Sequence, residues 1–190
     1  ELDSWVRNQA MAECSSLGLG SKTFFLDVNF SPYQPVDDAF VESVFNTAAL
    51  TEFPLEQLII EVTESERMKF DNHTIENLSI LKRTGAMLAI DDFGTGYSSI
   101  ENLIKVSADT LKTDKILVDN LEHDKSRQFL MKTLIDTTHG LGMHIVVEGV
   151  EREAQLDILK QLGADYIQGY YFSKPLTADQ FGAEAGRYAS

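Results

Sequence analysis

Short apolar runs alternate along the chain with longer stretches in which apolar residues recur every three or four positions. The runs are typical of buried β-strands, and the periodic stretches are typical of helices that bury one face. In residues 37–51, for example, Phe40, Val44 and Ala48 fall on one helical face. We therefore expect six strands, within residues 23–30, 58–62, 86–90, 110–118, 143–147 and 165–172. We expect helices at residues 2–13, 37–51, 72–84, 98–106, 126–139, 152–162 and 177–189.

Short returns join the helices to the strands. A helix-ending glycine stands a few residues before a strand at Gly85, Gly142 and Gly163. Such alternation favours parallel strands joined by helical crossovers, in an open sheet or in a closed barrel. Polar residues end the strands along the whole chain, and a barrel gathers all its strand ends around one axis. The pattern therefore favours an α/β fold, a TIM-type (β/α) barrel with six strand–helix units.

The count of strands and the composition bear on domain organisation. A barrel of this type has eight strands, so we expect residues 1–190 to be a single domain that lacks its first two strands. No run approaches the ~20 apolar residues of a membrane span. Cys14 is the only cysteine, which indicates a buried free thiol and a reducing compartment. We expect a cytoplasmic protein, or the cytoplasmic domain of a larger one that is attached to a membrane.

Charge narrows the classes of function. The formal net charge is −14, which argues against a protein that binds nucleic-acid polymers, because those present basic surfaces. Most of the acids solvate the surface, but several stand at the ends of apolar strands. Gathering carboxylates without cations is electrostatically unfavourable, so these acids indicate a divalent metal.

The sharpest candidate is the pair Asp91-Asp92, which follows an apolar strand and precedes Gly94. At the start of a loop both carboxylates can reach one site, where two hard cations would assist phosphoester displacement; the plain alternative is a turn-starting pair. Glu61 lies within an apolar strand, and Asn29 ends another. Each has a simpler reading, Glu61 as a helix cap and Asn29 as a turn residue. Glu64 fits the cap better than Glu61 does.

Two later strands add a cation and further polar groups. Lys112 and Asp114 alternate on one strand face, so they form either a structural ion pair or part of a site in which the lysine stabilises phosphate charge or orients a water. Glu148 follows an apolar strand, Glu151 supports the loop, and Gln168 has an amide that can bind a base or a phosphate. The histidines lack the spacing of a zinc site and indicate structural or surface positions; they are His73, His123, His139 and His144.

Taken together, these motifs resemble those of the EAL domain family, the bacterial phosphodiesterases that act on cyclic di-GMP. The matching segments occur in the family's order and cover essentially the whole chain. They are Asp27-Val28-Asn29-Phe30-Ser31-Pro32, Glu61-Val62-Thr63-Glu64-Ser65, Asp91-Asp92-Phe93-Gly94-Thr95-Gly96-Tyr97-Ser98-Ser99, Leu111-Lys112-Thr113-Asp114, Glu148-Gly149-Val150-Glu151 and Gln168-Gly169-Tyr170-Tyr171-Phe172-Ser173-Lys174-Pro175-Leu176.

The resemblance implies a modified TIM-type barrel that hydrolyses one phosphodiester bond of cyclic di-GMP to give linear 5′-pGpG, with two ions of Mg²⁺ or Mn²⁺ as cofactor. It implies metal ligation by Asn29, Glu61, Asp91 and Asp92, with Asp114 and Glu148 around the second metal or its water. Lys112 would assist the attacking water or the phosphate charge, and Gln168 would contact the substrate. Glu64 and Glu151 would hold the loop Asp92–Ser99, which in this family borders a dimer interface, so a homodimer is expected.

One departure leaves alternatives open. The Glu-Ala-Leu motif that names the family, whose Glu is a metal ligand in active members, is absent from residues 1–190. The second hypothesis is therefore a cyclic di-GMP receptor or signalling module without turnover. A third is another metal-dependent barrel enzyme, such as a lyase with Lys112 as its base. An attached sensor or diguanylate cyclase domain is a further expected partner.

Overall fold

A computed structural model describes residues 2–18, 24–31, 35–63, 71–93 and 104–188. The chain divides into two compact units, which are described one at a time. The first unit contains Glu1–Leu88 and Pro175–Ser190, and the second contains Ala89–Lys174. Among the helices described, none is long and apolar enough to cross a membrane.

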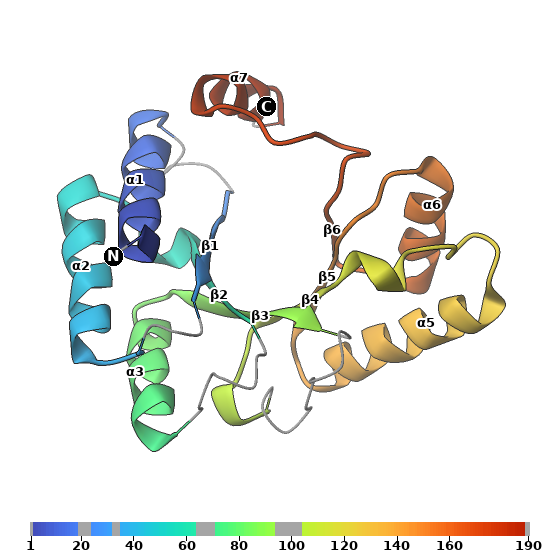
Figure 1. Ribbon diagram of the computed structural model, residues 1–190, viewed down its shortest axis with the longest axis horizontal. Helices are drawn as coiled ribbons and strands as arrows, with labels where there is room; N and C mark the ends of the chain where they lie inside the picture. Colours follow the sequence, from blue (N-terminus) through green and yellow to red (C-terminus); the bar gives the residue numbers. More distant parts are fainter. Residues whose placement is uncertain (1, 19–23, 32–34, 64–70, 94–103, 189–190) are drawn as a thin grey trace. The chain divides into compact units, whose positions relative to one another are not determined.

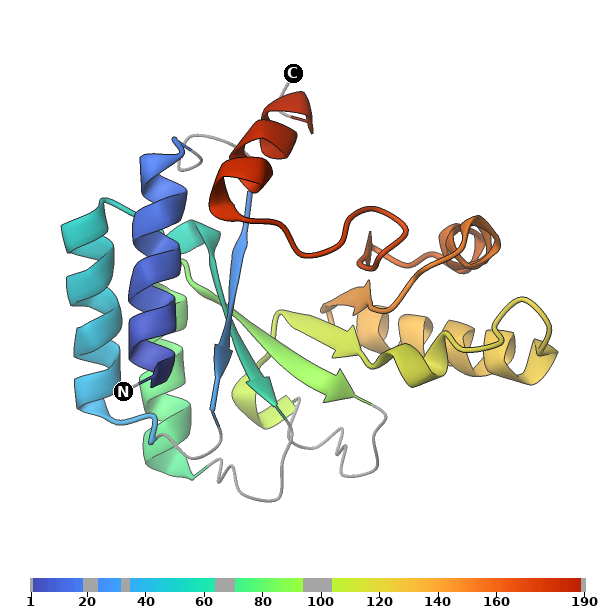
Figure 2. The ribbon, with the colours of Figure 1, turned by 45° about the horizontal axis from the view of Figure 1, so that its top comes forward.

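In the first unit, helices pack against a parallel pair of strands. Strands β1 and β2 pair in parallel, with Asn29 opposite Glu61. Figure 2 shows α1, α2 and α3 together on one side of these strands, and α1 and α2 lie side by side in Figure 1. The elements of this unit are α1 (Leu2–Ser16), β1 (Leu26–Phe30), α2 (Asp38–Thr51), the 3₁₀ helix η2 (Leu55–Gln57), β2 (Leu58–Thr63), α3 (Asn72–Arg83) and α7 (Ala178–Tyr188).

Helix α2 shows how the sequence forms these elements. Asp37 caps its N-terminus, because one carboxylate oxygen accepts a hydrogen bond of 2.9 Å from the Phe40 N–H. The predicted apolar face is confirmed, since Phe40, Val44 and Ala48 are all buried. The Phe40 ring meets Phe30 of β1 edge to face, with 4.8 Å between the ring centroids. This contact fixes α2 on the helix-covered face of the strands.

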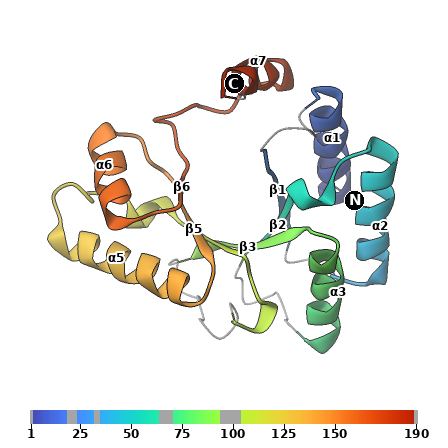
Figure 3. The same ribbon diagram turned by 180° about the vertical axis from the view of Figure 1, so that it is seen from behind.

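The second unit follows the same plan around strands β4, β5 and β6. These three strands and most of β3 pair in parallel in chain order. Figure 3 shows α5 and α6 beside β5, and their buried side chains form one apolar core with it. The elements are β3 (Met87–Phe93), β4 (Thr110–Thr113), the 3₁₀ helix η3 (Lys115–Leu117), α5 (Lys125–Gly140), β5 (His144–Val147), α6 (Glu153–Leu162) and β6 (Tyr166–Ile167).

The most marked differences from the predicted strands are in β3, β4 and β6. Strand β3 continues past residue 90 as far as Phe93, because the Asp114 N–H donates to the Phe93 carbonyl at 3.5 Å and extends the pairing. Strand β4 ends at Thr113, and η3 follows it at once. Strand β6 contains two residues, after which the backbone turns. The predicted helix 98–106 lies mostly outside the described residues, although residues 104–106 are helical.

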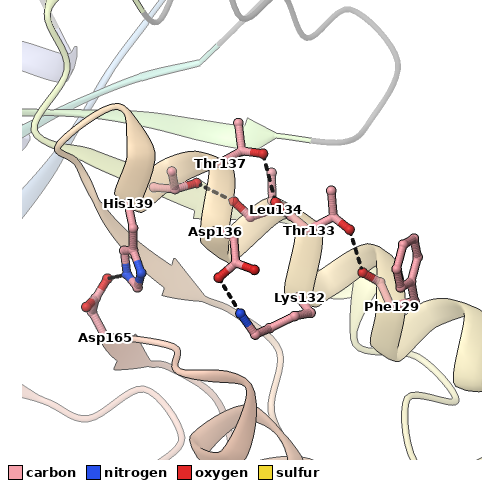
Figure 4. Close-up of polar contacts among 9 residues, drawn as sticks. Phe129, Lys132, Thr133, Leu134, Asp136, Thr137, His139 and Asp165 are labelled. Carbon is pink, nitrogen blue, oxygen red and sulfur yellow. Dashed lines mark hydrogen bonds and ion pairs between the residues drawn. The ribbon is translucent and has the colours of Figure 1, made fainter.

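One face of α5 carries short-range polar contacts, which are drawn in Figure 4. Lys132 pairs with Asp136 one turn along the helix, and Phe129 is 75% exposed. Near the end of the helix, the His139 ring nitrogen Nε2 lies 2.8 Å from Asp165 Oδ2. The same oxygen accepts the Ile145 N–H at 2.8 Å. Asp165 thus ties the end of α5 to the start of β5, and His139 has the structural position that the sequence indicates.

Candidate functional site

In the second unit, the paired acids lie at an irregularity of β3. The register against β4 shifts between Ile90 and Phe93, and Asp92 takes a left-handed conformation with φ of 57°. The Asp92 N–H donates to Asp91 Oδ1 at 2.9 Å. The prediction that these acids begin a loop is therefore wrong, because they stand within the strand. The predicted loop would let both carboxylates reach one site. The bulge can do the same, because it breaks the alternation that would send adjacent side chains to opposite faces.

Lys112 places a positive charge at the carboxyl ends of the strands in the second unit. It is 5% exposed, and its Nζ lies 2.7 Å from Glu148 Oε1. The partner follows from the register, because Lys112 stands opposite Val146 and Glu148 comes two residues later on the same face. The structural ion pair that the sequence considered for Lys112 therefore exists, but its partner is Glu148 on the neighbouring strand.

Asp114 leaves β4 at the same end. Its carboxylate oxygen Oδ1 accepts the Ile116 N–H at 2.7 Å and caps η3. This bond fixes the orientation of the carboxyl group. Asp114 thus combines the capping role with a place beside the other acids.

The electrostatics of these strand ends favour a bound cation. Partial burial and the negative charges of Asp91, Asp114 and Glu148 raise the pKa of Asp92 above its usual value, and Lys112 opposes them. Such an excess of carboxylates fits a hard divalent ion with oxygen ligands. Within the described residues, no three His, Cys, Asp or Glu side chains stand close enough together to hold a metal ion as they are. The oxygen donors match a hard divalent ion in chemistry and in charge, but the described side chains are not spaced to hold one as they stand.

Asn29 and Glu61 belong to the first unit. They are register partners on β1 and β2, so their side chains leave the strands on the same face. Asn29 is exposed, whereas Glu61 is 3% exposed. The structure thus brings these two predicted ligands next to each other at the carboxyl ends of their strands.

Gln168 and Glu151 occupy the turns after β6 and β5. The Gln168 backbone bonds twice to the preceding turn, donating to the Val147 carbonyl at 2.9 Å and accepting from the Val150 N–H at 3.1 Å. Its side chain is exposed. Glu151 is exposed as well, and its N–H donates to Gln155. Glu64 and residues 94–99 of the predicted loop lie outside the described residues.

Gln155 is a residue that sequence reasoning missed. It stands in the first turn of α6 and is 2% exposed. A glutamine on a helix gives no hydrophobic signal, so the apolar pattern does not single it out. The signal that could have found it is the spacing of Arg152 and Gln155, since Gln at the third helical position often bonds back to the start of the helix.

The fold and the strand ends define a class of protein: a (β/α) protein with oxygen donors and one buried lysine at the carboxyl ends of parallel strands. The sequence profile of the EAL domain family matches residues 1–175. The chain belongs to the EAL domain family.

Two solved structures and one curated relative illustrate the similarity. The crystal structure of the EAL domain of Mycobacterium smegmatis DcpA superposes with a TM-score of 0.91 at 33% identity, over all of this chain and 86% of that one. A manganese/cy-diGMP complex of Klebsiella pneumoniae BlrP1 has a TM-score of 0.82 at 29% identity, over 93% of this chain and 45% of that one. The "Probable cyclic di-GMP phosphodiesterase PdeG" of Escherichia coli (strain K12) is 36% identical over 173 residues, 90% of this chain and 33% of that protein.

These likenesses confirm the predicted TIM-type barrel of the EAL kind. Family members include cyclic di-GMP phosphodiesterases, and structures of family members hold Ca²⁺ or Mn²⁺. The chain spans about a quarter to a third of the length of the curated relatives that it matches.

Proposed function

We propose that this chain hydrolyses one phosphodiester bond of cyclic di-GMP to give linear 5′-pGpG, with Mg²⁺ or Mn²⁺. The observation that carries the proposal is the ion pair of Lys112 and Glu148, set on strands whose ends also bear Asp91, Asp92 and Asp114. A buried ammonium beside an excess of carboxylates suits a dianionic phosphodiester once divalent ions offset the acids.

The metals would be held by Asn29, Glu61, Asp91 and Asp92, with Asp114 and Glu148 around the second ion or its water. When bound, such ions stabilise charge on the phosphoryl oxygens and lower the pKa of a coordinated water. Glu148 Oε1 holds the Lys112 ammonium in place at 2.7 Å. The ammonium has three donors, so it can keep this bond while it orients a water or a phosphate oxygen. The Gln168 amide contacts the base or the phosphate of the substrate.

A cyclic di-GMP receptor without turnover is the second candidate. It is favoured by the finding that no three acids within the described ranges stand together at an ion position. In a receptor, the same lysine and amide would bind the dinucleotide, and the weaker metal site would leave it uncut. The two candidates share a ligand and differ in the product.

The deciding experiment follows the full-length protein with cyclic di-GMP in Mn²⁺ and in Mg²⁺, with separation of substrate and product by chromatography and mass spectrometry. Release of pGpG that is lost in Lys112→Met supports the phosphodiesterase and excludes the receptor. Calorimetric binding without product supports the receptor. Neither binding nor product would refute both candidates.

The partners and the location are part of the same proposal. We infer a homodimer that forms through the Asp92–Ser99 region, and an attached sensor or diguanylate cyclase domain in a cytoplasmic protein. The share of the relatives' length that the chain spans supports further domains. Sedimentation of the full-length protein tests the dimer, with a monomer at micromolar concentration as the contrary result.

A further inference from the structure

Gln155 links two of the turns that carry the candidate site. Its Oε1 accepts hydrogen bonds from the N–H groups of Glu151 and Arg152, both at 3.0 Å. Its Nε2 donates to the Val118 carbonyl at 3.3 Å. The first two groups belong to the turn after β5, and Val118 ends η3 after β4. One buried amide therefore bonds to the turn that begins at Glu148 and to the segment that begins at Asp114.

The two turns are packed so closely that a shift of one moves the other. Gly149, next to Glu148, has φ of +77°, and a Cβ placed there would come within 2.9 Å of Lys115 Cα. The nearest atom to that Cβ would be the Lys115 Cβ, so the Gly149 backbone packs directly against Lys115. A second interaction between these segments is the bidentate ion pair of Arg152 with Glu122. It lies at the surface, where ion pairs contribute little to stability.

The Gln155 amide is the stronger tie because Gln155 itself is 2% exposed, which shields its polar groups from water. Replacing one partner of a buried hydrogen bond leaves the other donors and acceptors without a partner, which costs more than the bond itself contributes. Loss of the Gln155 amide would leave the Glu151 and Arg152 N–H groups without their acceptor. The turn would then move to reach water, and Glu148, at the start of this turn, would leave Lys112.

We propose that Gln155 is a positioning residue, which acts through Glu148 to hold the Lys112–Glu148 ion pair in its reactive arrangement; this rests on the proposed phosphodiesterase function. The residue touches neither the substrate nor the reacting atoms. Its amide instead fixes the backbone on which the Glu148 side chain stands. The site's geometry would thus depend on an interaction beneath the turns as well as on the strand ends.

The experiment compares Gln155→Met, which keeps the volume but removes the amide, with Gln155→Glu, which keeps the acceptor oxygen. The matched control is Gln128→Met, because the Gln128 Nε2 also donates to a backbone carbonyl, that of Leu121 at 2.8 Å, and Leu121 is outside the turn after β5. We expect Gln155→Met to lower kcat by about 10–100-fold with little change in KM, as supporting residues around a metal site do. Gln155→Glu should lose less, and Gln128→Met should keep the wild-type kcat.

A double-mutant cycle with Glu148→Gln separates positioning from a general loss of structure. If Gln155 acts through Glu148, Gln155→Met has no further effect in the Glu148→Gln background. Additive losses, or a Gln155→Met enzyme with the wild-type kcat, would overturn the proposal. Should Gln155→Met fail to fold, Gln155→Glu decides: if this variant folds but loses the full ~10–100-fold in kcat that is expected of Gln155→Met, the retained acceptor oxygen does not matter and the proposal is contradicted.

A readout without turnover keeps the two proposals distinguishable. The NMR signal of the Lys112 ammonium reports its ion pair directly. In Gln155→Met this signal should move toward its position in Glu148→Gln, and in Gln128→Met it should stay at the wild-type position. If the wild-type protein releases no pGpG, the proposed function has failed, and the Lys112 signal alone decides the role of Gln155. An unmoved signal would refute that role.

Discussion

The close approach of the turns after β4 and β5 gives a quantitative prediction for Gly149→Ala. Two costs add at this position. The residue has φ of +77°, a left-handed conformation that costs an L-residue about 1–2 kcal/mol. An added Cβ would also meet Lys115, lying within 2.9 Å of its Cα, and overpacking of this kind costs about 1–3 kcal/mol. We expect Gly149→Ala to lower the free energy of unfolding by about 2–5 kcal/mol.

Gly163→Ala is the matched control, because it has the first cost without the second. Gly163 ends α6 with φ of +91°, and a Cβ there would have no neighbour within 4 Å. Its cost should therefore be about 1–2 kcal/mol. The difference between the two variants measures the contact with Lys115 alone.

The free energies of unfolding of both variants are measured in urea. Thermal unfolding is a second check, because each kcal/mol lost should lower Tm by about 2–4 °C. Turnover provides a second readout, since displacement of the Glu148 turn should reduce kcat in Gly149→Ala and leave it unchanged in Gly163→Ala. Equal free energies of unfolding for the two variants would refute the claim that the turns touch.

Three further predictions concern other parts of the chain. Asp91→Asn should reduce turnover by several orders of magnitude and leave the circular dichroism spectrum unchanged; a near-native rate would mean that Asp91 does not hold metal. Burial by itself would raise the pKa of Asp165, but the hydrogen bonds with Ile145 and His139 lower it overall. The Asp165 carboxylate therefore stabilises the folded protein above about pH 4, and this stabilisation is lost as the pH falls through the lowered pKa. Unfolding curves at pH 7 and pH 3 should therefore differ less for Asp165→Asn than for the wild type, and an equal difference would count against this bond. Asp124 caps α5 through the Ser126 N–H at 2.8 Å, so Asp124→Ala should cost about 0.5–2 kcal/mol with an unchanged urea m-value, and no measurable cost would show that the cap is dispensable.

The sequence predicts the strand ends well because their signal is local. An apolar run that ends in an acid or an amide identifies both a buried strand and a polar group at its carboxyl end, as Asn29 and Glu61 show. The register that makes them neighbours follows once the strands are parallel. Helix caps are equally local, because the three-residue spacing of Thr177 and Gln180 is that of a capping box. The Thr177 N–H donates to Gln180 Oε1 at 3.1 Å, and the Gln180 N–H donates back to Thr177 Oγ1 at 3.4 Å.

Features that depend on the pairing of distant segments could not be predicted in this way. Lys112 and Asp114 are two residues apart, so the sequence predicts that they pair. Strand β4 ends at Thr113, however, and its register against β5 brings Lys112 to Glu148. The bulge at Asp91 and Asp92 is an irregularity in the pairing of β3 with β4, and it is followed by the bond that the Asp114 N–H donates to the Phe93 carbonyl. Gln155 is buried only because backbone groups of two separate turns meet it, and no local pattern records that.

The first unit is assembled from both ends of the chain, since α7 joins it after the whole of the second unit. The Phe181 ring of α7 lies 5.8 Å from that of Phe24, and Gly182 faces Leu17 of the segment after α1. On the ribosome, which emits residues in order at about 5–20 per second, the early helices and strands therefore wait several seconds for their last helix. Residues 89–174 form one contiguous unit, so this unit can finish folding before the first unit has all of its segments.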